Sequence, residues 1–197
     1  MIFNSMKIKN KERVCTCCGE VGHYGGKLRA ENESNPKDGW FRLYWENDQL
    51  RYEWEYKDSQ RADGISKAWF PSGQIKSIHT YKDGEIDGLM TNWYENGHKR
   101  YEGTIKDGVL NDGLYTDWYE NGQKRWEGSY KEGKEDGLGT SWYENGQKGS
   151  EGTYKDGKQD GLWTYWYDNG QKEEERTYKN GEEISVKEWN EDGSVKE

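Results

Sequence analysis

Six residues, Trp-Tyr-Glu-Asn-Gly-Gln at positions 142–147, constrain the fold of this chain more than any other feature, because nearly the same hexapeptide recurs along it. Two aromatic residues suit a half-buried β-strand, and the Asn-Gly pair after them suits a tight reversal. The first aromatic residue of each copy marks seven positions: Tyr44, Trp69, Trp93, Trp118, Trp142, Trp166 and Trp189. Their spacing of 23 to 25 residues predicts an array of seven repeats.

A complete repeat has the pattern of one β-hairpin with a polar turn at each end. Residues 138–143 run into Asn145-Gly146, and residues 151–154 return toward Asp156-Gly157. Apolar and polar side chains alternate along both segments, as in half-buried strands, and Asn-Gly or Asp-Gly pairs favour tight reversals. The strands are therefore expected in antiparallel pairs, one pair per repeat.

The length of each turn decides which residues share a face of the sheet. A three-residue Glu120-Asn121-Gly122 connection, with Gly122 left-handed in a β-bulge, puts the apolar residues of both strands on one side. That predicted apolar face holds alternate residues of one hairpin: Leu114, Thr116, Trp118, Trp126, Gly128 and Tyr130. Trp142 belongs to the same buried face in the next repeat. The same reasoning predicts a loop with an odd number of residues through Glu132-Gly133.

Glycines in the middle of the returning strands, at Gly103, Gly128 and Gly152, weaken a strand unless a side chain covers them, so we expect a Trp ring over each. Seven hairpins give a ribbon roughly 25 Å wide and roughly 60 Å long. The predicted fold is all-β: an elongated single-layer antiparallel meander of about seven hairpins over residues 39–197. Residues 1–38 do not repeat and are interpreted as a short N-terminal cap and linker.

Composition and charge narrow the classes of function. Only 30% of the 197 residues are hydrophobic, yet the chain has 11 Trp and 15 Tyr, which favours a thin sheet over a globule or a disordered chain. Residues 1–38 hold seven Lys or Arg against five Asp or Glu, a balance of +2, and residues 39–197 hold 22 against 33, a balance of −11. An acidic array favours a basic protein partner and disfavours nucleic acid and anionic membranes.

The N-terminal segment contains a possible metal site. Thiolates of Cys15, Cys17 and Cys18 and the imidazole of His23 are Zn²⁺ ligands, but the Cys-x-Cys-Cys spacing lacks the paired Cys-x-x-Cys motifs of common structural sites. The alternative is a free-thiol cap on the first hairpin. A small, local cysteine set and the lack of an apolar leader predict a cytoplasmic protein, and no cofactor is expected.

Asp-Gly turns form a second ladder of candidate ligands: Asp63, Asp87, Asp112, Asp136 and Asp160. A calcium site needs several oxygen atoms within about 2.6 Å of one ion, whereas these carboxylates are expected about 10 Å apart along the array. Turn chemistry is therefore the preferred explanation.

The second aromatic residue of each turn is the candidate partner-binding set: Phe70, Tyr94, Tyr119, Tyr143 and Tyr167. Alternation places these rings opposite the Trp row. Two interpretations stay open, since such rings pair across strands and shield a sheet, and Tyr is also enriched at protein interfaces.

The run Trp-Glu-Gly-Ser-Tyr-Lys-Glu-Gly-Lys-Glu-Asp-Gly at residues 126–137 resembles a MORN repeat. With the added Trp-Tyr-Glu-Asn-Gly-Gln turn it is similar to the MORN-variant repeats of the bacterial YwqK-type antitoxin family, over roughly residues 40–193. The resemblance implies single-layer antiparallel sheets that act as binding or scaffolding surfaces, and for the YwqK type it implies neutralisation of a partner toxin. The chain departs from the usual pattern where a His is frequent: Asp87, Asp112, Asp136 and Asp160.

These observations favour a non-enzymatic binding protein. Only three His are present, and the carboxylates recur with the repeat instead of marking one cleft. The leading hypothesis is an antitoxin or immunity protein that covers a basic toxin with its acidic aromatic sheet. The alternative is a structural scaffold that tethers partners or associates through its sheet edges. Charged residues near the C-terminal edge favour a monomer when the protein is free.

Overall fold

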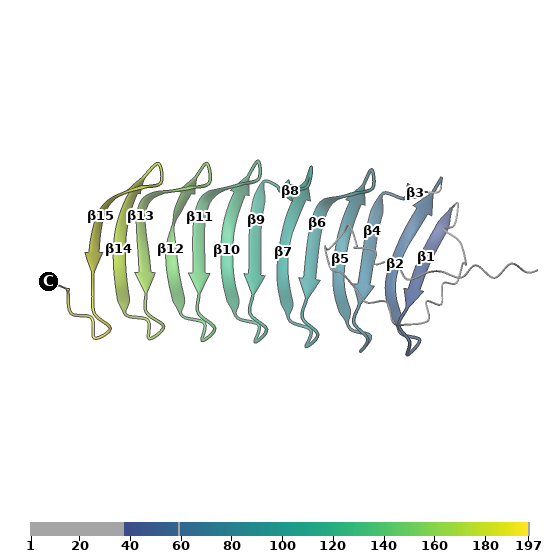
Figure 1. Cartoon of the computed structure of the whole chain (residues 1–197), viewed down its shortest axis with the longest axis horizontal. Coiled ribbons are helices and arrows are strands. Elements are labelled where there is room, and N and C mark those ends of the chain that lie inside the picture. Colours follow the sequence, from purple (N-terminus) through teal and green to yellow (C-terminus); the bar gives the residue numbers. More distant parts are fainter. Residues whose placement is uncertain (1–37, 59, 197) are drawn as a thin grey trace, which may run out of the picture.

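A computed structural model describes residues 38–58 and 60–196. In this part of the chain all regular structure is β: fifteen strands form one antiparallel sheet, and neighbouring strands follow one another in chain order. Figure 1 shows the strands side by side in a single layer, with β1 and β15 at opposite ends. The predicted elongated meander is confirmed. The proposed cap and the zinc candidates Cys15, Cys17, Cys18 and His23 lie outside the described residues.

Each hairpin pairs an outgoing strand with a returning one. The outgoing strands are β1 (Gly39–Tyr44), β4 (Gly64–Trp69), β6 (Glu85–Trp93), β9 (Gly113–Trp118), β11 (Lys134–Trp142), β13 (Lys158–Trp166) and β15 (Glu182–Glu188). The returning strands are β2 (Leu50–Lys57), β5 (Ile75–Lys82), β7 (Lys99–Lys106), β10 (Lys124–Lys131), β12 (Lys148–Lys155) and β14 (Lys172–Lys179). Two short strands, β3 (Gln60–Arg61) and β8 (Val109–Leu110), precede β4 and β9 where the sequence has one extra residue.

The Asn-Gly turns have the predicted three-residue loop. The Tyr119 N–H donates to the Gln123 carbonyl at 2.8 Å, the Gly122 N–H donates to the Tyr119 carbonyl at 2.9 Å, and Gly122 has a φ of 86°. Gly tolerates this left-handed conformation without a side-chain clash. Equivalent bonds close seven turns along the chain, the last between Asn190 and Ser194, so the seven predicted turns are present and, among the described residues, six of them are followed by a returning strand.

The predicted division of side chains between the faces is wrong, because a second bulge follows each Asn-Gly turn. Lys124 pairs with Trp118 and Trp126 pairs with Asp117, which leaves Arg125 as an extra residue. One extra residue moves everything beyond it to the other face. Tyr115, and not Leu114, therefore lies opposite Gly128.

This register gives the sheet two different faces. The aromatic face of the central hairpins carries Tyr115, Asp117, Trp126, Gly128 and Tyr130. The threonine face carries Leu114, Thr116, Trp118, Glu127 and Ser129. By the same register Trp142 belongs to the threonine face, where it is half-buried, and not to the packed aromatic face.

The odd connection expected through Glu132-Gly133 is also wrong. Lys131 pairs directly with Lys134, and Glu132 and Gly133 have φ values of 49° and 79°. Two consecutive left-handed residues make a two-residue type I′ turn, whose twist matches that of the flanking strands. The two observed faces stay consistent across this two-residue loop, because the extra residue Arg125 has already changed by one the number of residues between the paired strands.

Aromatic rings packed on glycines make the thin core. A Cβ added to Gly152 would lie 2.2 Å from Cδ2 of Trp163, a side chain that is only 2% exposed. Gly103 is covered in the same way by Tyr115, and Gly128 by Trp126. The prediction of rings over glycines holds, although one ring is a Tyr and none belongs to the Trp markers of the turns.

Candidate binding surfaces

A repeated polar network covers the threonine face. Thr116 Oγ1 donates to Glu127 Oε2 at 3.3 Å, Lys124 Nζ forms an ion pair with the same carboxylate, and Lys124 Nζ lies 5.4 Å from the Trp142 ring centroid. The neighbouring repeats copy this arrangement with Thr91, Glu102, Lys99 and Trp118, and with Thr140, Glu151, Lys148 and Trp166. The marker Trp rings thus lie beneath lysine ammonium groups, a cation–π arrangement.

Beside this network runs a row of exposed aliphatic side chains, one per hairpin: Ile65, Leu89, Leu114, Leu138 and Leu162. Each is between 52% and 56% exposed. Their cross-strand partners are small hydroxyl residues, for example Ser129 for Leu114 and Thr153 for Leu138. The aliphatic row places one such side chain on each outgoing strand from β4 to β13. Exposed apolar side chains that gather on one face are typical of interaction sites. The row and the repeated Lys–Glu spacing both recur with the repeat, yet neither was predicted from the sequence as a binding feature.

The predicted partner-binding tyrosines connect consecutive repeats. The hydroxyl of Tyr119 donates to the Trp142 carbonyl at 2.9 Å, and that of Tyr143 donates to the Trp166 carbonyl at 2.7 Å. Tyr94 and Tyr167 make the same bond to Trp118 and Trp189. Phe70, which has no hydroxyl, has Lys76 Nζ 5.8 Å from its ring centroid. These contacts give the row of second aromatic residues a structural role. The rings are half-buried, and their role in partner binding stays a prediction.

The asparagines of the turns add a parallel ladder. Asn121 Oδ1 accepts the Gln123 N–H at 2.9 Å, and its Nδ2 donates to the Glu144 carbonyl of the next turn at 2.7 Å. Asn96 and Asn145 do the same one repeat before and after. One side chain therefore both shapes its own turn and fixes the distance to the next one.

At the other ends of the strands, away from the Asn-Gly turns, Asp carboxylates also bridge consecutive repeats. Asp63 Oδ1 accepts the backbone N–H of Asp83 at 2.8 Å, and Asp112 accepts that of Glu132 at 3.0 Å. Asp136 and Asp160 bind the N–H groups of Asp156 and Asn180, and Asp87 lies half-buried in β6. Among the described residues no three His, Cys, Asp or Glu side chains gather as a metal site would require.

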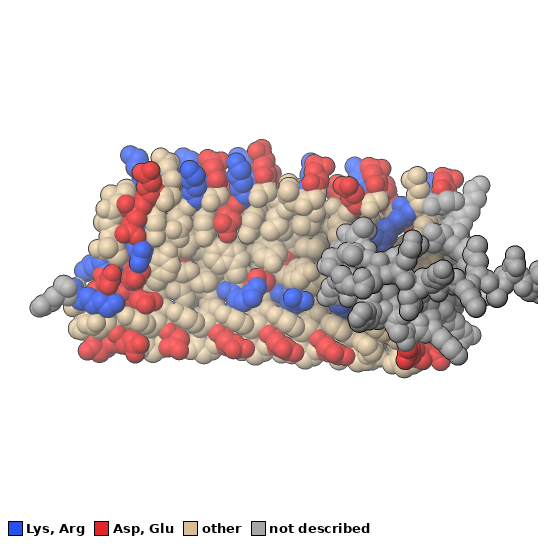
Figure 2. Space-filling model, in the orientation of Figure 1, with Lys and Arg blue, Asp and Glu red and all other residues tan. Residues whose placement is uncertain are grey.

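The two rims differ in charge. Each of the seven three-residue loops except the second begins with an exposed acid: Glu46, Glu95, Glu120, Glu144, Asp168 and Glu191. Figure 2 shows this acidic rim as a row of separate Asp and Glu patches along the lower border, whereas the upper border mixes both signs. Between the borders, the part of this face that is drawn in colour is mostly uncharged. The acidic rim is therefore a long border on which a single charge sign predominates.

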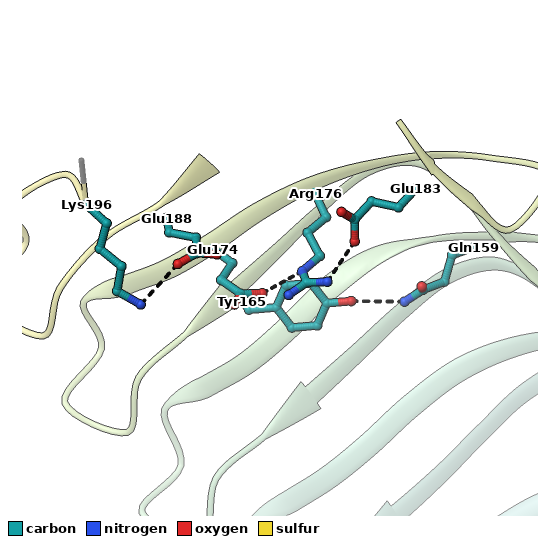
Figure 3. A network of polar contacts seen from close by, with 7 residues as sticks. All are labelled: Gln159, Tyr165, Glu174, Arg176, Glu183, Glu188 and Lys196. Atoms are coloured by element: carbon teal, nitrogen blue, oxygen red, sulfur yellow. Dashed lines mark hydrogen bonds and ion pairs between the residues drawn. The ribbon is translucent and has the colours of Figure 1, made fainter. Parts of the chain in front are cut away.

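At the C-terminal end of the aromatic face, cations are matched by carboxylates (Figure 3). Arg176 Nε binds Glu174 at 2.6 Å and its Nη1 binds Glu183 at 2.7 Å, while Lys196 binds Glu188 at 3.3 Å. Hydrogen bonding from Arg176 lowers the pKa of Glu174. Nearby, burial raises the pKa of Tyr165 to about 12, and Gln159 Nε2 donates to its hydroxyl at 3.0 Å. This end of the face is closed by its own ion pairs.

At the N-terminal end, the cations of the aromatic face lie on rings. Arg61 lies 4.0 Å from the ring centroid of Tyr81 and 4.8 Å from that of Trp54. His79 Nε2 is 3.0 Å from Asn92 Nδ2, and burial lowers the pKa of this imidazole. A cavity of about 220 Å³ opens between these groups.

Comparisons with known proteins agree with the repeat pattern. The family model described as MORN repeat variant matches six segments of the chain: residues 37–58, 62–83, 86–107, 111–132, 135–156 and 159–180. A search of curated proteins finds no match. In the described part of the chain, no helix is long and apolar enough to cross a membrane.

Proposed function

We propose, from the premise that the chain belongs to the MORN repeat variant family, that it is a non-enzymatic repeat protein that binds a protein partner across its open sheet. The observation that carries this proposal is the aliphatic row of the threonine face, Ile65 to Leu162, in which every side chain is more than half exposed. Burying such a row on a partner releases water from apolar surface, which is the main driving force of protein association.

The partner that we propose is a basic toxin, which makes the protein an antitoxin or immunity protein of the bacterial cytoplasm. Support comes from the resemblance to YwqK-type antitoxins, from the balance of −11 over residues 39–197 and from the acidic rim. Opposite charge accelerates the encounter, and the apolar row then holds the complex. Neutralisation follows from steric occlusion of the active site of the toxin.

A test of the binding surface uses the double substitution Leu114→Ser and Leu138→Ser. Both side chains are exposed, so the melting temperature should change little, whereas affinity for the partner should fall at least about tenfold because two apolar contacts are lost. Val109→Ser, which changes an exposed aliphatic residue at the rim in β8, is the matched control. Unchanged affinity in the double variant would remove the row from the interface.

The identity of the partner is tested in cells. Co-expression with the product of the adjacent gene should restore growth if that product is the toxin, and the two proteins should purify together. Restored growth that the Leu114→Ser, Leu138→Ser variant fails to provide would support direct neutralisation. A neighbouring gene whose product neither inhibits growth nor purifies with the chain would contradict the antitoxin assignment.

A scaffold is the second candidate, favoured by the open edge of β15. Ile184 and Val186 are 61% and 46% exposed on this edge strand, and unpaired strand edges invite association. Glu182, Glu183 and Lys187 place charges on the same strand, so we expect a monomer at micromolar concentration. Light scattering decides between the two, since a mass that rises with concentration would favour the scaffold.

A further inference from the structure

We propose that the aliphatic row of the threonine face binds one amphipathic α-helix of the partner, which lies along the array and across the strands. The inference rests on the proposed function and goes further, because it specifies the secondary structure and the side-chain pattern of the segment that binds. Four leucines on β6, β9, β11 and β13 define the docking surface, and each is between 52% and 56% exposed: Leu89, Leu114, Leu138 and Leu162.

Large and small side chains alternate along this surface. Each leucine pairs with a small hydroxyl residue of the returning strand: Leu89 with Thr104, Leu114 with Ser129, Leu138 with Thr153 and Leu162 with Thr177. Side chains of a strand stand roughly perpendicular to the sheet, so a leucine projects on every outgoing strand and a lower position follows on the next strand. Apolar side chains of a partner can therefore pack between the leucines, over the hydroxyl residues.

The spacing of the leucines favours a helix over an extended segment. Successive leucines are two strands apart in the sheet (Figure 1), which is about 9.6 Å at a strand spacing of about 4.8 Å. Seven residues of an α-helix rise about 10.5 Å, so residues i and i+7 of one helix meet successive gaps of the row. Side chains on one face of an extended strand recur about every 6.6 Å and do not match these gaps.

A polyproline II helix has a comparable repeat of about 9.3 Å per turn. Segments of that kind are bound by grooves lined with aromatic rings, whereas the projecting residues of this row are aliphatic. The chemistry of the row therefore favours the apolar stripe of an α-helix.

Charges on the two sides of the row differ in sign. Toward the Asn-Gly turns, two residues before each hydroxyl residue, the same face carries the carboxylates of Glu102, Glu127, Glu151 and Glu175. Toward the other ends of the strands, two residues after it, the face carries the exposed side chains of Lys106, Lys131, Lys155 and Lys179. The row therefore lies between a line of acids and a line of bases.

These two lines determine the charge that we expect on the helix. The glutamates already form ion pairs within their own strands, with Lys99, Lys124, Lys148 and Lys172. The exposed lysines of the other line are complementary to acidic residues on the helix flank that faces them. A basic partner can present such a flank, because its net charge governs the approach and a few local residues govern the final contact.

Fluorescence anisotropy titrations of the full chain with labelled three-heptad peptides test the helix, since about 20 helical residues span the roughly 29 Å from Leu89 to Leu162. The first peptide has leucines at positions a and d, glutamates on one flank and enough lysines on the opposite side for a net charge of zero. The second has the same composition, rearranged so that leucines alternate as in a strand. We expect at least about tenfold tighter binding of the helical peptide. Equal affinities, no binding, or tighter binding of the alternating peptide would overturn the proposal.

Variants of the chain locate the contact. Leu114→Ser with Leu138→Ser should weaken binding of the helical peptide at least about tenfold, because two apolar contacts are lost without a change of charge. The control Val109→Ser, at the rim in β8, should stay within about twofold of the unmodified chain. Equal affinities of the double variant and the control would place the helix elsewhere and contradict the proposal.

The acidic flank is tested with Lys131→Gln and Lys155→Gln in one chain. A third helical peptide has Gln in place of the flank glutamates and of an equal number of lysines. Binding of the glutamate-flanked peptide should fall at least about threefold in this variant, whereas binding of the Gln-flanked peptide should stay within about twofold. Equal losses for both peptides would contradict the charged flank.

Failure of the helix is distinguishable from failure of the antitoxin assignment. A toxin that purifies with the unmodified chain and not with the Leu114→Ser, Leu138→Ser variant, while the helical peptide does not bind, would overturn the helix and leave the proposed function intact. Binding of the helical peptide by the row, with an adjacent gene product that neither inhibits growth nor purifies with the chain, would give the opposite result.

Discussion

Gly152 shows how a single residue determines the thin core. Its missing side chain lets the Trp163 ring lie flat on the neighbouring strand, where the ring also contacts Tyr154 at 4.8 Å between centroids. The indole Nε1 donates to the Thr153 carbonyl at 3.1 Å, so the polar edge of this buried ring is satisfied. The sequence indicated that a ring must cover this glycine. It did not show which one, because Trp163 and Trp166 alternate on the same strand.

Gly152→Ala should therefore lower the free energy of unfolding by about 1–3 kcal/mol, the usual cost of overpacking a close-packed site. Gly149→Ala is the matched control, because its added Cβ would approach only one atom closer than 3.4 Å, the Ser141 Oγ at 3.0 Å, and no ring lies against it at that distance. Urea denaturation followed by Trp fluorescence measures both variants. Equal stability of the two would show that the ring does not rest on Gly152.

His79 supplies a residue-scale pH dependence. Burial lowers its pKa below the ordinary value of 6.5, with a further lowering by Arg61, so the unfolded chain binds the proton more readily than the folded one. Stability contributed by the neutral imidazole is present above pH 6.5 and is lost as the pH falls from there toward the folded pKa. Melting temperatures between pH 7.5 and 5.5 should fall more for the unmodified chain than for His79→Gln. Parallel profiles would exclude His79 as the cause.

At the scale of the hairpin, the bulge at Arg125 decides which face is which. Deleting this residue would close the bulge and keep Trp126 opposite Asp117, but the buried Asp117 carboxylate would lose the Arg125 guanidinium that binds it. We expect the deletion to lower the free energy of unfolding of the central repeats, as measured by near-ultraviolet circular dichroism during denaturation. A deletion in the exposed C-terminal turn, of Asp192, is the control and should leave the central signal intact.

Consecutive hairpins are joined by the tyrosine ladder as well as by the strand ladder. Tyr119→Phe with Tyr143→Phe removes the bonds to the Trp142 and Trp166 carbonyls and keeps both rings, so we expect a loss of about 1 kcal/mol per bond. Denaturation measures the loss, and partner affinity is measured on the same variant. A drop in affinity larger than the drop in stability would favour the interface interpretation over the structural one.

At the scale of the whole molecule, the distribution of charge differs between the two long borders of the sheet and between its two ends. The acidic rim forms one long border, while at the C-terminal end of the aromatic face the cations are paired with carboxylates (Figures 2 and 3). A partner therefore meets a surface whose charge depends on its direction of approach. This arrangement favours one orientation of docking.

Association with a basic partner should slow as salt increases, because screening shortens the reach of the acidic rim to about 8 Å at physiological ionic strength. We expect the association rate to fall at least about tenfold between 0.02 and 0.5 M NaCl, while the dissociation rate changes less. Stopped-flow fluorescence measures both rates. Glu120→Gln with Glu144→Gln should flatten the salt dependence, and a flat profile for the unmodified chain would remove the steering role.

The amino-acid sequence by itself determined the number of repeats, the hairpin of each repeat and the three-residue Asn-Gly turns, because these depend on local preferences that recur every 23 to 25 residues. Only the tertiary structure decided which side chains share a face. That choice rests on one extra backbone residue at Arg125, whose side chain carries no mark of a bulge, and a single-residue change of register reverses both faces. The docking surface of the leucines depends on the same event, since the bulge places Leu114 opposite Ser129.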